Sequence, residues 1–516
     1  MNDTNIRLDA LVTDAPPQKS VGTAPNIARE MIHAIISDSR EVPKYGLHAL
    51  FVAITGSAFD GHDFLLSAYN AGCRIFAVSH ECALPEDALQ LIYPDTRIAL
   101  ALLSASFYRH PSKELTVIGV TGTKGKTTTC LLIEAILNGA EIPTGYIGTS
   151  GIRYAGVSHE SPNTTPESLI LQRVMRKMAD AGIHVVVMEV SSQALMQHRV
   201  YGIDFSQVVF TNLSLDHVGK NEHPDFEHYK STKRLLFTHY RSERAILNRD
   251  DPHALDFLPG DGRAVATFST LTPVPLKEDP LKSPALWASD VAPSFSDGGS
   301  VGVSFTLHKE GVKKTVLPAF LPLPGACNVQ NALAALLVCD GLFVPPEKAV
   351  SLLRDIRIVG RCEPIEAENG IRVLIDYAHN EASLREILRA LRDYTEARLI
   401  VLFGSVGGRT KERRAPMGAV ASALADFCIL TSDNPDFEPP ENIFSDIERG
   451  FVSPCPYVKI PDRKEAIQYG LSIAQKGDIL LLAGKGHESY QLVSGEKLPF
   501  SEREIVKEWL SHTQHV

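Results

Sequence analysis

Residues 119–128 read GVTGTKGKTT, and they decide the fold of the central part of this 516-residue chain. An apolar run at 115–120 precedes them and a helix-like run at 130–137 follows, which predicts a strand, a glycine-rich turn and a helix start. Such a turn binds phosphate, because successive backbone N–H groups and the helix N-terminus stabilise an anion. Lys126 can reach the β- and γ-phosphates of a nucleotide, and the Thr127 hydroxyl can bind Mg²⁺.

The spacing of this loop departs from the standard phosphate-loop pattern. In G-x-x-x-x-G-K-[ST] the first glycine would stand at Val120, whereas here the glycines stand at 119, 122 and 125. A tight turn with an incidental lysine does not account for Gly125, Lys126 and Thr127 together. The sequence therefore predicts nucleotide binding.

Composition limits the classes of protein to which the chain can belong. A hydrophobic content of 44% and a charged content of 22% are globular values, and the length predicts two to four domains. The net charge of −10 gives no basic footprint for nucleic acid. No apolar run approaches the roughly 18 residues of a membrane span, and the N-terminus lacks a signal peptide's apolar stretch. The eight cysteines show no metal-ligand spacing, so we expect reduced thiols and a cytoplasmic protein without membrane insertion.

Alternating strand-like and helix-like runs predict an α/β protein of three domains. A loose lead-in at 1–30 precedes a small α/β domain at 31–112. A central domain with the phosphate loop and a parallel sheet spans 113–358, and a Rossmann-like doubly wound domain spans 359–516. Apolar runs without polar alternation, such as 185–189 and 399–403, suit parallel strands covered on both faces.

Polar residues in the central domain stand where strands end, the edge at which α/β sheets bind ligands. Glu189 is the last residue of the apolar run 185–189, and it could either hold Mg²⁺ or be a capping or ion-paired surface residue. His217 follows the next strand-like run, and as an unusual Mg²⁺ ligand it could be a ligand, a structural residue or a proton-transfer group. Lys233 lies in a helical pattern, where a lysine is normally solvated.

Further polar loops suggest other binding contacts. Residues 162–166 (PNTTP) form either a turn with a helix cap or a binding loop, and Arg199 suits a carboxylate or phosphate. In the third domain a basic cluster at 409–414, a DNP turn at 433–435 and the segment 483–488 (AGKGHE) each follow a strand-like run. Three polar loops at strand ends predict a second binding crevice.

Taken in order, these segments resemble the Mur ligases, the ATP-dependent amino acid ligases of peptidoglycan synthesis, and within them the tripeptide synthetase branch. The resemblance extends from residue 37 to residue 488, nearly the whole chain. Its motifs are SDSR, GVTGTKGKTTT, NTTPE, MEVSSQALMQHR, TNLSLDH, HYKSTKRLL, GACNVQNALAA, DYAHN, DNP and AGKGHE.

The resemblance implies a reaction, its cofactors and its partners. The carboxylate of UDP-N-acetylmuramoyl-L-alanyl-D-glutamate attacks the γ-phosphate of ATP, and the amine of a diamino acid then displaces phosphate from the acyl phosphate. Magnesium ions stabilise charge on the transferring group. We expect a monomer acting in cell wall biogenesis.

The resemblance also implies roles for individual residues. The catalytic set is Lys126, Lys233 and His217. The magnesium ligands are Thr127, Glu189, His217 and Lys233, the last as a carbamate (N6-carboxylysine). The ATP contacts are Gly122, Thr123, Lys124, Gly125, Lys126, Thr127, Thr128, Asn328, Asn331, Arg361 and Asp376. The contacts to the UDP-linked dipeptide are Ser37, Ser39, Asn163, Thr164, Thr165, Ser191, Gln197 and Arg199. The contacts to the incoming amino acid are Arg409, Asp433, Asn434, Asp436, Gly484 and Glu488.

One departure from the family bears on the amino acid that is added. Members that add meso-diaminopimelate typically read DNPR, and the arginine pairs with the second carboxylate of that substrate. Asp436 stands in its place here. A carboxylate repels a carboxylate and attracts an ammonium, so we expect L-lysine or ornithine to be preferred, and EHP at 222–224 resembles lysine-adding members.

Two alternatives remain open. Lys124 stands where this branch usually has Asn, and the GTKGK spelling is shared with the folylpolyglutamate synthases, which are sister ligases. The second alternative is a nucleotide-binding homologue without turnover. The intact set of Lys126, Glu189, His217 and Lys233 argues against it.

Overall fold

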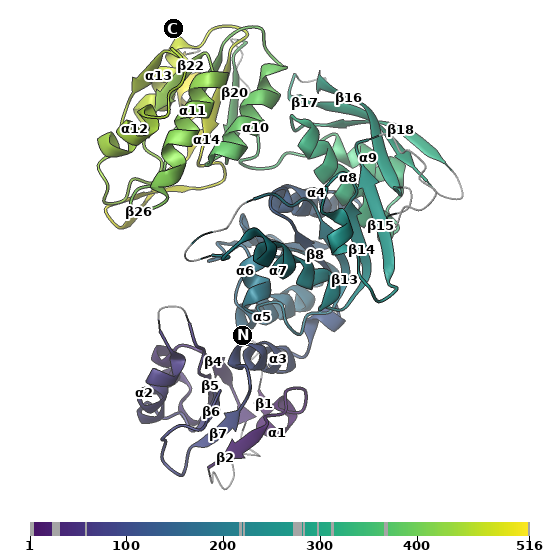
Figure 1. Ribbon diagram of the computed structural model, residues 1–516, viewed down its shortest axis with the longest axis vertical. Helices are drawn as coiled ribbons and strands as arrows, with labels where there is room; N and C mark the ends of the chain where they lie inside the picture. Colours follow the sequence, from purple (N-terminus) through teal and green to yellow (C-terminus); the bar gives the residue numbers. More distant parts are fainter. Residues whose placement is uncertain are drawn as a thin grey trace. The chain divides into compact units, whose positions relative to one another are not determined.

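A computed structural model of the chain describes residues 5–22, 31–56, 59–215, 219, 222–271, 281, 284–296, 299–310, 314–365 and 370–513 (Figure 1). These residues divide into two compact units. Unit 1 comprises residues 1–268, 275–284 and 337–342, and unit 2 comprises residues 269–274, 285–336 and 343–516. The α/β class predicted from the sequence is confirmed, whereas the domain limits at 31, 113 and 359 stay a prediction.

The first sheet of unit 1 has the strand order β2-β7-β6-β5-β4. Its strands are β2 (Lys19–Val21), β4 (Ala34–Ile36), β5 (Ala49–Val52), β6 (Ile75–Val78) and β7 (Leu89–Ile92). All are parallel except β2. Alternate strand residues face two different helices, α3 (Thr96–Phe107) on one side and α2 (Leu65–Asn70) on the other.

The loose lead-in expected for residues 1–30 is wrong for its described part, residues 5–22. There β1 (Ile6–Arg7) pairs with β3 (Met31–Ile32), and β2 pairs with β7. The short helix α1 (Leu8–Leu11) buries Leu8 and Leu11 in the same core as α3. Burial of these few apolar side chains stabilises a segment whose composition is otherwise polar.

The larger sheet of unit 1 runs β11-β10-β9-β12-β8-β13-β14-β15. The strands β8 (Thr116–Thr121), β9 (Thr144–Gly148), β12 (Val185–Glu189), β13 (Phe205–Phe210), β14 (Ser242–Asn248) and β15 (Ala264–Ser269) are parallel. The edge strands β10 (Gly151–Tyr154) and β11 (Val157–His159) are antiparallel. The central position of β8, between β12 and β13, brings three strand ends together at one edge of the sheet.

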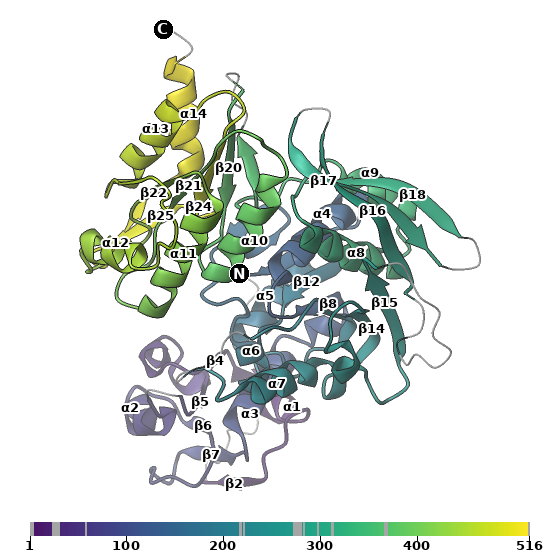
Figure 2. The same ribbon diagram turned by 45° about the horizontal axis from the view of Figure 1, so that its top comes forward.

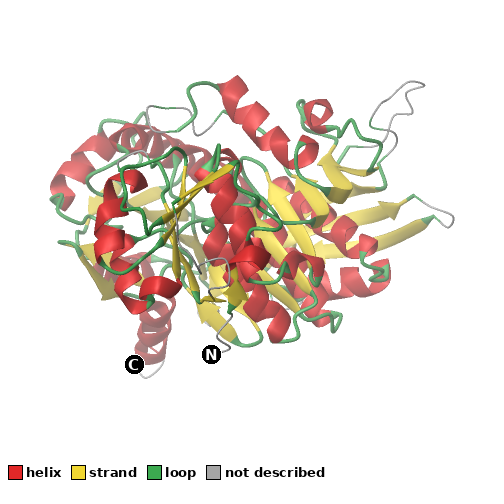
Figure 3. Cartoon of the chain, turned by 90° about the horizontal axis from the view of Figure 1, so that it is seen from below, coloured by secondary structure: helices red, strands yellow, loops and turns green. Residues whose placement is uncertain are grey.

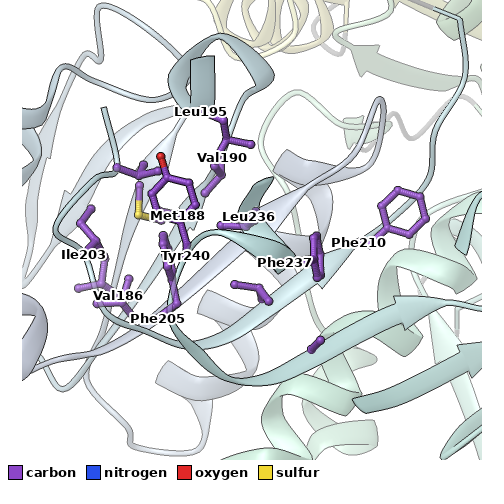
Figure 4. Close-up of a cluster of buried hydrophobic side chains, with 14 of the residues drawn as sticks. Val186, Met188, Val190, Leu195, Ile203, Phe205, Phe210, Leu236, Phe237 and Tyr240 are labelled. Carbon is purple, nitrogen blue, oxygen red and sulfur yellow. The ribbon is translucent and has the colours of Figure 1, made fainter. Parts of the chain in front are cut away.

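Helices cover this sheet and fix its strand ends. The helix α4 (Lys126–Gly139) packs on β8, β9 and β12. The helices α5 (Ser168–Asp180), α6 (Ser192–Met196) and α7 (Phe226–Thr238) share a core with alternate residues of β8, β12 and β13. Figure 4 shows part of that core, in which Met188 and Phe205 of the sheet lie with Leu236 and Phe237 of α7. The 3-10 helix η6 (Ala254–Phe257) adds Phe257 to this core.

Unit 2 contains an antiparallel set of strands, β16 (Leu286–Phe295), β17 (Val301–Lys309) and β18 (Thr315–Leu321). It also has a six-stranded sheet with the order β19-β20-β24-β21-β22-β23. These strands are β19 (Glu363–Ile365), β20 (Arg372–Asp376), β21 (Leu399–Phe403), β22 (Phe427–Leu430), β23 (Tyr457–Lys459) and β24 (Ile479–Ala483). All except β19 are parallel, as expected for a doubly wound domain.

Both faces of the six-stranded sheet are covered, as Figures 2 and 3 show. One face packs against α10 (Glu381–Arg392), α11 (Arg414–Leu424) and α12 (Pro440–Glu448), and the other against α13 (Arg463–Ile473) and α14 (Glu502–Thr513). Neighbouring residues of one strand, such as Val401 and Leu402, enter different cores. The remaining elements are α8 (Ala326–Gly341), α9 (Pro346–Leu353) and the hairpin of β25 (Tyr490–Val493) with β26 (Glu496–Pro499).

Candidate active site

The glycine-rich loop lies between β8 and α4, as the sequence predicted. Gly122 has φ +151° and Gly125, at the start of the helix, has φ +81°. A Cβ atom at position 122 would lie 1.9 Å from the Thr211 hydroxyl oxygen. Positive φ and this close approach explain why glycine stands at both positions.

The exit of β13 holds the loop in place. The Thr123 amide donates to the Asn212 carbonyl at 2.9 Å, and the Lys124 amide donates to Asn212 Oδ1 at 2.9 Å. The Thr211 hydroxyl donates to the Lys124 carbonyl at 2.7 Å. Sequence reasoning used this TNLSLDH segment only for His217 and did not find Asn212 or Thr211. Their position directly after a strand that neighbours the loop strand was the available signal.

Two lysines converge on one carbonyl oxygen of the loop. Lys126 Nζ donates to the Gly122 and Thr123 carbonyls, both at 2.9 Å, and Lys233 Nζ donates to the Gly122 carbonyl, also at 2.9 Å. Lys233 is only 1% exposed, and its Nζ lies 4.7 Å from the ring centroid of Tyr229. The solvated position typical of a helical lysine is therefore wrong for Lys233, because α7 packs this face against the sheet.

Glu189 lies at the end of β12, beside the loop and almost fully buried. Its carboxylate accepts hydrogen bonds from the Thr127 hydroxyl at 3.0 Å, the Tyr146 hydroxyl at 2.6 Å and the Thr149 amide at 2.9 Å. Burial, with the Glu189 carboxylate second, raises the pKa of Tyr146 well above its usual value, so this hydroxyl stays protonated and donates.

These residues fit the nucleotide and metal that the sequence predicts. The oxygen atoms of Thr127 and Glu189 lie 3.0 Å apart, and such oxygen donors are the ligands that Mg²⁺ prefers. Thr128 is buried in the first turn of α4. His217 and its neighbour Asp216 lie outside the described residues.

The predicted contacts to the dipeptide gather around the end of β12. Thr165 donates its hydroxyl to the Glu189 carbonyl at 2.8 Å and accepts from the Ser191 amide at 3.0 Å. Arg199 donates to the Thr165 carbonyl at 2.9 Å and to Gln197 Oε1 at 2.6 Å. It also pairs with Glu167 at 2.9 Å, a partner that sequence reasoning missed.

The other predicted dipeptide contacts are more accessible. Asn163 is exposed, while the Thr164 hydroxyl lies 3.0 Å from that of Thr149. Ser37 and Ser39 lie apart from this group, at the carboxyl end of β4 in the first sheet. Between them, Asp38 caps the 3-10 helix η2 (Ser39–Lys44), and its hydrogen bonds from Arg40 lower its pKa to about 2.

In unit 2 the predicted ATP contacts form two groups. Asp376, at the end of β20, accepts the amides of Cys362 and Ala378 at 2.8 Å, and burial raises its pKa. Asn331 Nδ2 donates to Asn328 Oδ1 at 3.1 Å within α8. A cavity of about 320 Å³ lies nearby along the 354–364 segment, and its lining includes Arg354, Arg357, Arg361, Ser300 and Leu323.

The predicted amino acid contacts meet at the ends of β22 and β24. The fully buried Lys485 Nζ lies 3.4 Å from Asp433 Oδ1, 3.0 Å from Asn434 Oδ1 and 3.1 Å from Glu488 Oε2. Asn434 Nδ2 donates to Glu488 Oε2 at 3.0 Å. Gly484 follows β24 with φ +117°. Sequence reasoning missed Lys485, although it quoted the AGKGHE segment that contains it.

Asp436 and the basic cluster differ from their sequence interpretation. Asp436 has φ +53°, and its Oδ1 accepts the Gly495 amide at 2.7 Å, so the carboxylate caps the turn between β25 and β26. Arg409 is exposed, but Arg414 of the same cluster is fully buried between Glu438 and Asp446. The 409–414 cluster is therefore not a uniformly solvated surface, and part of it is structural.

A phosphate-binding loop in a parallel sheet defines a nucleotide-binding α/β protein, and the polar loops at the strand ends of the doubly wound sheet are typical of a second ligand site. Residues 120–339 match the Mur ligase middle domain, and residues 360–486 match the Mur ligase glutamate ligase domain. The chain belongs to the Mur ligase family, which confirms the resemblance seen in its motifs.

Relatives cover nearly the whole chain. A Chlorobaculum tepidum protein is 40% identical over 489 residues, covering 93% of this chain and 92% of its own. One from Caldanaerobacter subterraneus subsp. tengcongensis is 38% identical over 486 residues, covering 94% and 95%. Both are named UDP-N-acetylmuramoyl-L-alanyl-D-glutamate--2,6-diaminopimelate ligase. A solved structure of a protein with that name has 26% identity, a TM-score of 0.67 and coverage of 96% and 100%.

The names of these relatives bear on one expectation from the sequence, and the structure bears on another. They specify 2,6-diaminopimelate, so they do not support the preference for lysine or ornithine. In the part of the chain that the structure describes, no helix is long and apolar enough to cross a membrane.

Proposed function

We propose that the chain ligates 2,6-diaminopimelate to UDP-N-acetylmuramoyl-L-alanyl-D-glutamate, with conversion of ATP to ADP and phosphate. The observation that carries this proposal is the juxtaposition of Lys126, Thr127 and Glu189 at the loop, in a chain about two-fifths identical to ligases of that name. Lysine or ornithine is the second candidate amino acid, favoured by the negative charge of Asp436.

The proposed chemistry activates a carboxylate. The D-glutamyl carboxylate attacks the γ-phosphate and gives an acyl phosphate, and the amine of the diamino acid then attacks the acyl carbon and releases phosphate. Bound MgATP supplies the phosphoryl group and neutralises its developing charge. Lys126 exchanges its bonds to the Gly122 and Thr123 carbonyls for phosphate oxygens, while Thr127 and Glu189 present oxygen ligands. His217 is proposed to join them.

Lys233 is proposed to act as a carbamate. As an ammonium it shares the Gly122 carbonyl with the Lys126 ammonium, and these two like charges repel each other. Addition of CO₂ to the neutral amine, with loss of a proton, gives a carbamate whose negative charge is attracted to Lys126 and whose carboxylate is available to a metal ion. A carbamate signal from ¹³C-bicarbonate in NMR spectra of the protein, absent from Lys233→Arg, tests this assignment.

The remaining roles follow the grouping of the side chains. In unit 1 we assign the dipeptide to the group around β12, and the uridine to Ser37 and Ser39. The β12 group consists of Asn163, Thr164, Thr165, Ser191, Gln197 and Arg199. In unit 2 we assign ATP contacts to Asn328, Asn331, Arg361 and Asp376. The amino acid contacts are Arg409, Asp433, Asn434, Gly484 and Glu488, with Asp436 in the adjoining turn.

The test is phosphate release with ATP, Mg²⁺ and the UDP-linked dipeptide, with diaminopimelate, lysine and ornithine in parallel wells. Turnover that requires diaminopimelate is the expected result. Turnover with lysine or ornithine alone supports the ligase activity but shows that the added amino acid is lysine or ornithine and not diaminopimelate. Activity only when folate and glutamate are supplied overturns the proposal in favour of a folylpolyglutamate synthase, and no activity with any acceptor overturns it in favour of a homologue without turnover.

A further inference from the structure

The buried side chain of Arg463 joins the two loops that carry the candidate amino acid site. Arg463 is the first residue of α13, and its side chain is fully buried. Its Nη1 donates to the Ser432 carbonyl at 3.2 Å, and its Nη2 donates to the Ala483 carbonyl at 2.8 Å. Ser432 directly precedes Asp433, and Ala483 directly precedes Gly484. One guanidinium therefore holds the backbone on which both loops begin.

The sheet does not itself fix these loops to each other. The strands β22 and β24 both pair with β21, and neither pairs with the other. The Arg463 guanidinium spans this separation beyond the strand ends. Because the group is planar and its N–H donors have fixed directions, it sets the distance between the two carbonyls.

Glu502, at the start of α14, supplies the opposite charge. Its Oε1 accepts from Arg463 Nε at 2.9 Å and lies 2.8 Å from Nη2, and its side chain is 2% exposed. The pair thus orients the guanidinium along its Nε and Nη2 edge, while Nη1 donates to the Ser432 carbonyl and Nη2 also donates to the Ala483 carbonyl. A pair that served stability alone would not need donors aimed at both loops.

We propose that Arg463, oriented by Glu502, is a positioning residue for the incoming amino acid, because it sets the spacing of the β22 and β24 loops. This inference rests on the proposed function in taking those loops as the amino acid site. The Lys485 ammonium contacts Asp433 and Asn434 on one loop and Glu488 on the other. A change in the spacing of the loops moves these groups apart and lowers their affinity for an amino acid.

The chain provides a matched control at the opposite edge of the same sheet. Arg398 precedes β21 and pairs with the buried Asp478 at 2.6 Å, and it donates to the Ile473 carbonyl at 2.7 Å. It therefore combines one carboxylate with one carbonyl at the amino end of the strands, whereas the more deeply buried Arg463 combines one carboxylate with two carbonyls. Arg398→Lys and Arg463→Lys both keep a positive charge and lose the planar fork.

The experiment compares the steady-state constants of the two variants with those of the unchanged protein. We expect Arg463→Lys to raise KM for the amino acid by about 10-fold or more while KM for ATP stays within about 2-fold. Arg398→Lys should leave both constants within about 2-fold. An unchanged KM for the amino acid in Arg463→Lys, whatever its thermal destabilisation, overturns the inference and leaves Arg463 a structural residue.

A second measurement does not depend on turnover. Amide hydrogen exchange at Ser432 and Gly484, which donate to the Pro461 and Asp376 carbonyls, should be faster in Arg463→Lys and unchanged in Arg398→Lys. If the unchanged protein ligates no amino acid, the proposed function fails, and this exchange result alone decides whether Arg463 positions the loops. Unchanged exchange at both amides overturns the inference even if activity falls. Glu502→Gln keeps the Arg463 side chain but removes the negative charge paired with it. Exchange at Ser432 and Gly484 should then be faster than in the unchanged protein, but by less than in Arg463→Lys.

Discussion

The phosphate loop of unit 1 and the amino acid loops of unit 2 are held in place by different means. On its β13 side the phosphate loop is held by neutral groups, the backbone and side chains of Thr211 and Asn212, while Lys126 and Lys233 bind its carbonyls from the other elements. The amino acid loops are held by buried charges, the Lys485 ammonium and the Arg463 guanidinium. A loop that must accept a highly charged phosphate gains from a neutral support, because its own amides then remain the dominant field at the ligand.

Neutral hydrogen bonds and buried ion pairs differ in the free-energy cost of losing one partner. Loss of one neutral hydrogen bond costs about 1 kcal/mol, whereas loss of one partner from a buried ion pair leaves an uncompensated charge and costs about 3–5 kcal/mol. We therefore expect substitutions near the phosphate loop to affect chemistry with little effect on folding. Substitutions of charged groups in unit 2 should affect folding and binding together.

The largest effect is expected at Lys126. Lys126→Met removes the positive charge that meets the transferring phosphoryl group, and the rate of phosphate release should fall by roughly 10³-fold. The melting temperature should change little, because the loop keeps its bonds to Asn212. The exposed Lys113 serves as the control, since Lys113→Met should retain full activity. If the rate of phosphate release falls by less than about 10-fold in Lys126→Met, another group must supply the positive charge that meets the phosphoryl group.

Glu189 tests the metal assignment at the same loop. Glu189→Gln replaces one accepting oxygen by an NH₂ group, which faces donors from Thr127, Tyr146 and Thr149. We expect the Mg²⁺ concentration for half-maximal activity to rise by about 10–100-fold, measured by titration at saturating ATP. Glu243→Gln, at an exposed position of β14, is the control. An unchanged Mg²⁺ requirement would show that Glu189 serves only to order the loop.

The Arg414–Glu438 ion pair of unit 2 should make the stability of the fold depend on pH in the acid range. Hydrogen bonds from Arg414 lower the pKa of Glu438 to about 2, from an ordinary value of 4.5. A lowered folded-state pKa stabilises the fold above about pH 4.5, and this stabilisation is lost as the pH falls towards 2. Glu438→Gln should cost about 2 kcal/mol in urea unfolding at pH 6, and the difference should shrink at pH 3.5. A difference independent of pH would mean that the Arg414–Glu438 pair contributes by packing.

The same contrast explains what could be predicted from the sequence. The phosphate loop was predicted because its glycines, Lys126 and Thr127 are contiguous and follow an apolar strand. The strands β12 and β21 were predicted at their observed bounds, since each is a short apolar run without polar alternation. Such local signals are sufficient where neighbours along the chain are also neighbours in space.

The charged supports were not predicted, because their partners are distant in sequence. Arg463 pairs with Glu502 and binds the carbonyls of Ser432 and Ala483, and no periodic pattern joins these positions. The burial of Lys233 depends likewise on the packing of α7 against the sheet rather than on its own helical spacing. Lys485 lies within the AGKGHE motif, but its contacts to Asp433 and Asn434 join positions that are distant in sequence.

The smallest effect is expected at Asp436, a charged carboxylate whose partner is the neutral backbone amide of Gly495. Asp436 was expected to select a basic diamino acid by its charge, yet its Oδ1 accepts the Gly495 amide at 2.7 Å and its φ is +53°. Asparagine tolerates this left-handed conformation and keeps an accepting oxygen, so Asp436→Asn removes the charge alone. If the carboxylate acts mainly on the turn, the ratio of kcat/KM for lysine to that for diaminopimelate should stay within about 2-fold, measured by competition.

A fall of that ratio by about 10-fold or more in Asp436→Asn would restore the charge argument and favour lysine or ornithine as the substrate. Asp436→Arg separates the two effects further, because it also removes the bond to Gly495 and should cost about 1 kcal/mol of stability. A stability loss in Asp436→Arg without a selectivity change in either variant assigns Asp436 to the groups that shape the loops, with Lys485 and Arg463. Selection of the diamino acid would then depend on the other proposed contacts, of which Arg409 is exposed and Glu488 is held by Asn434.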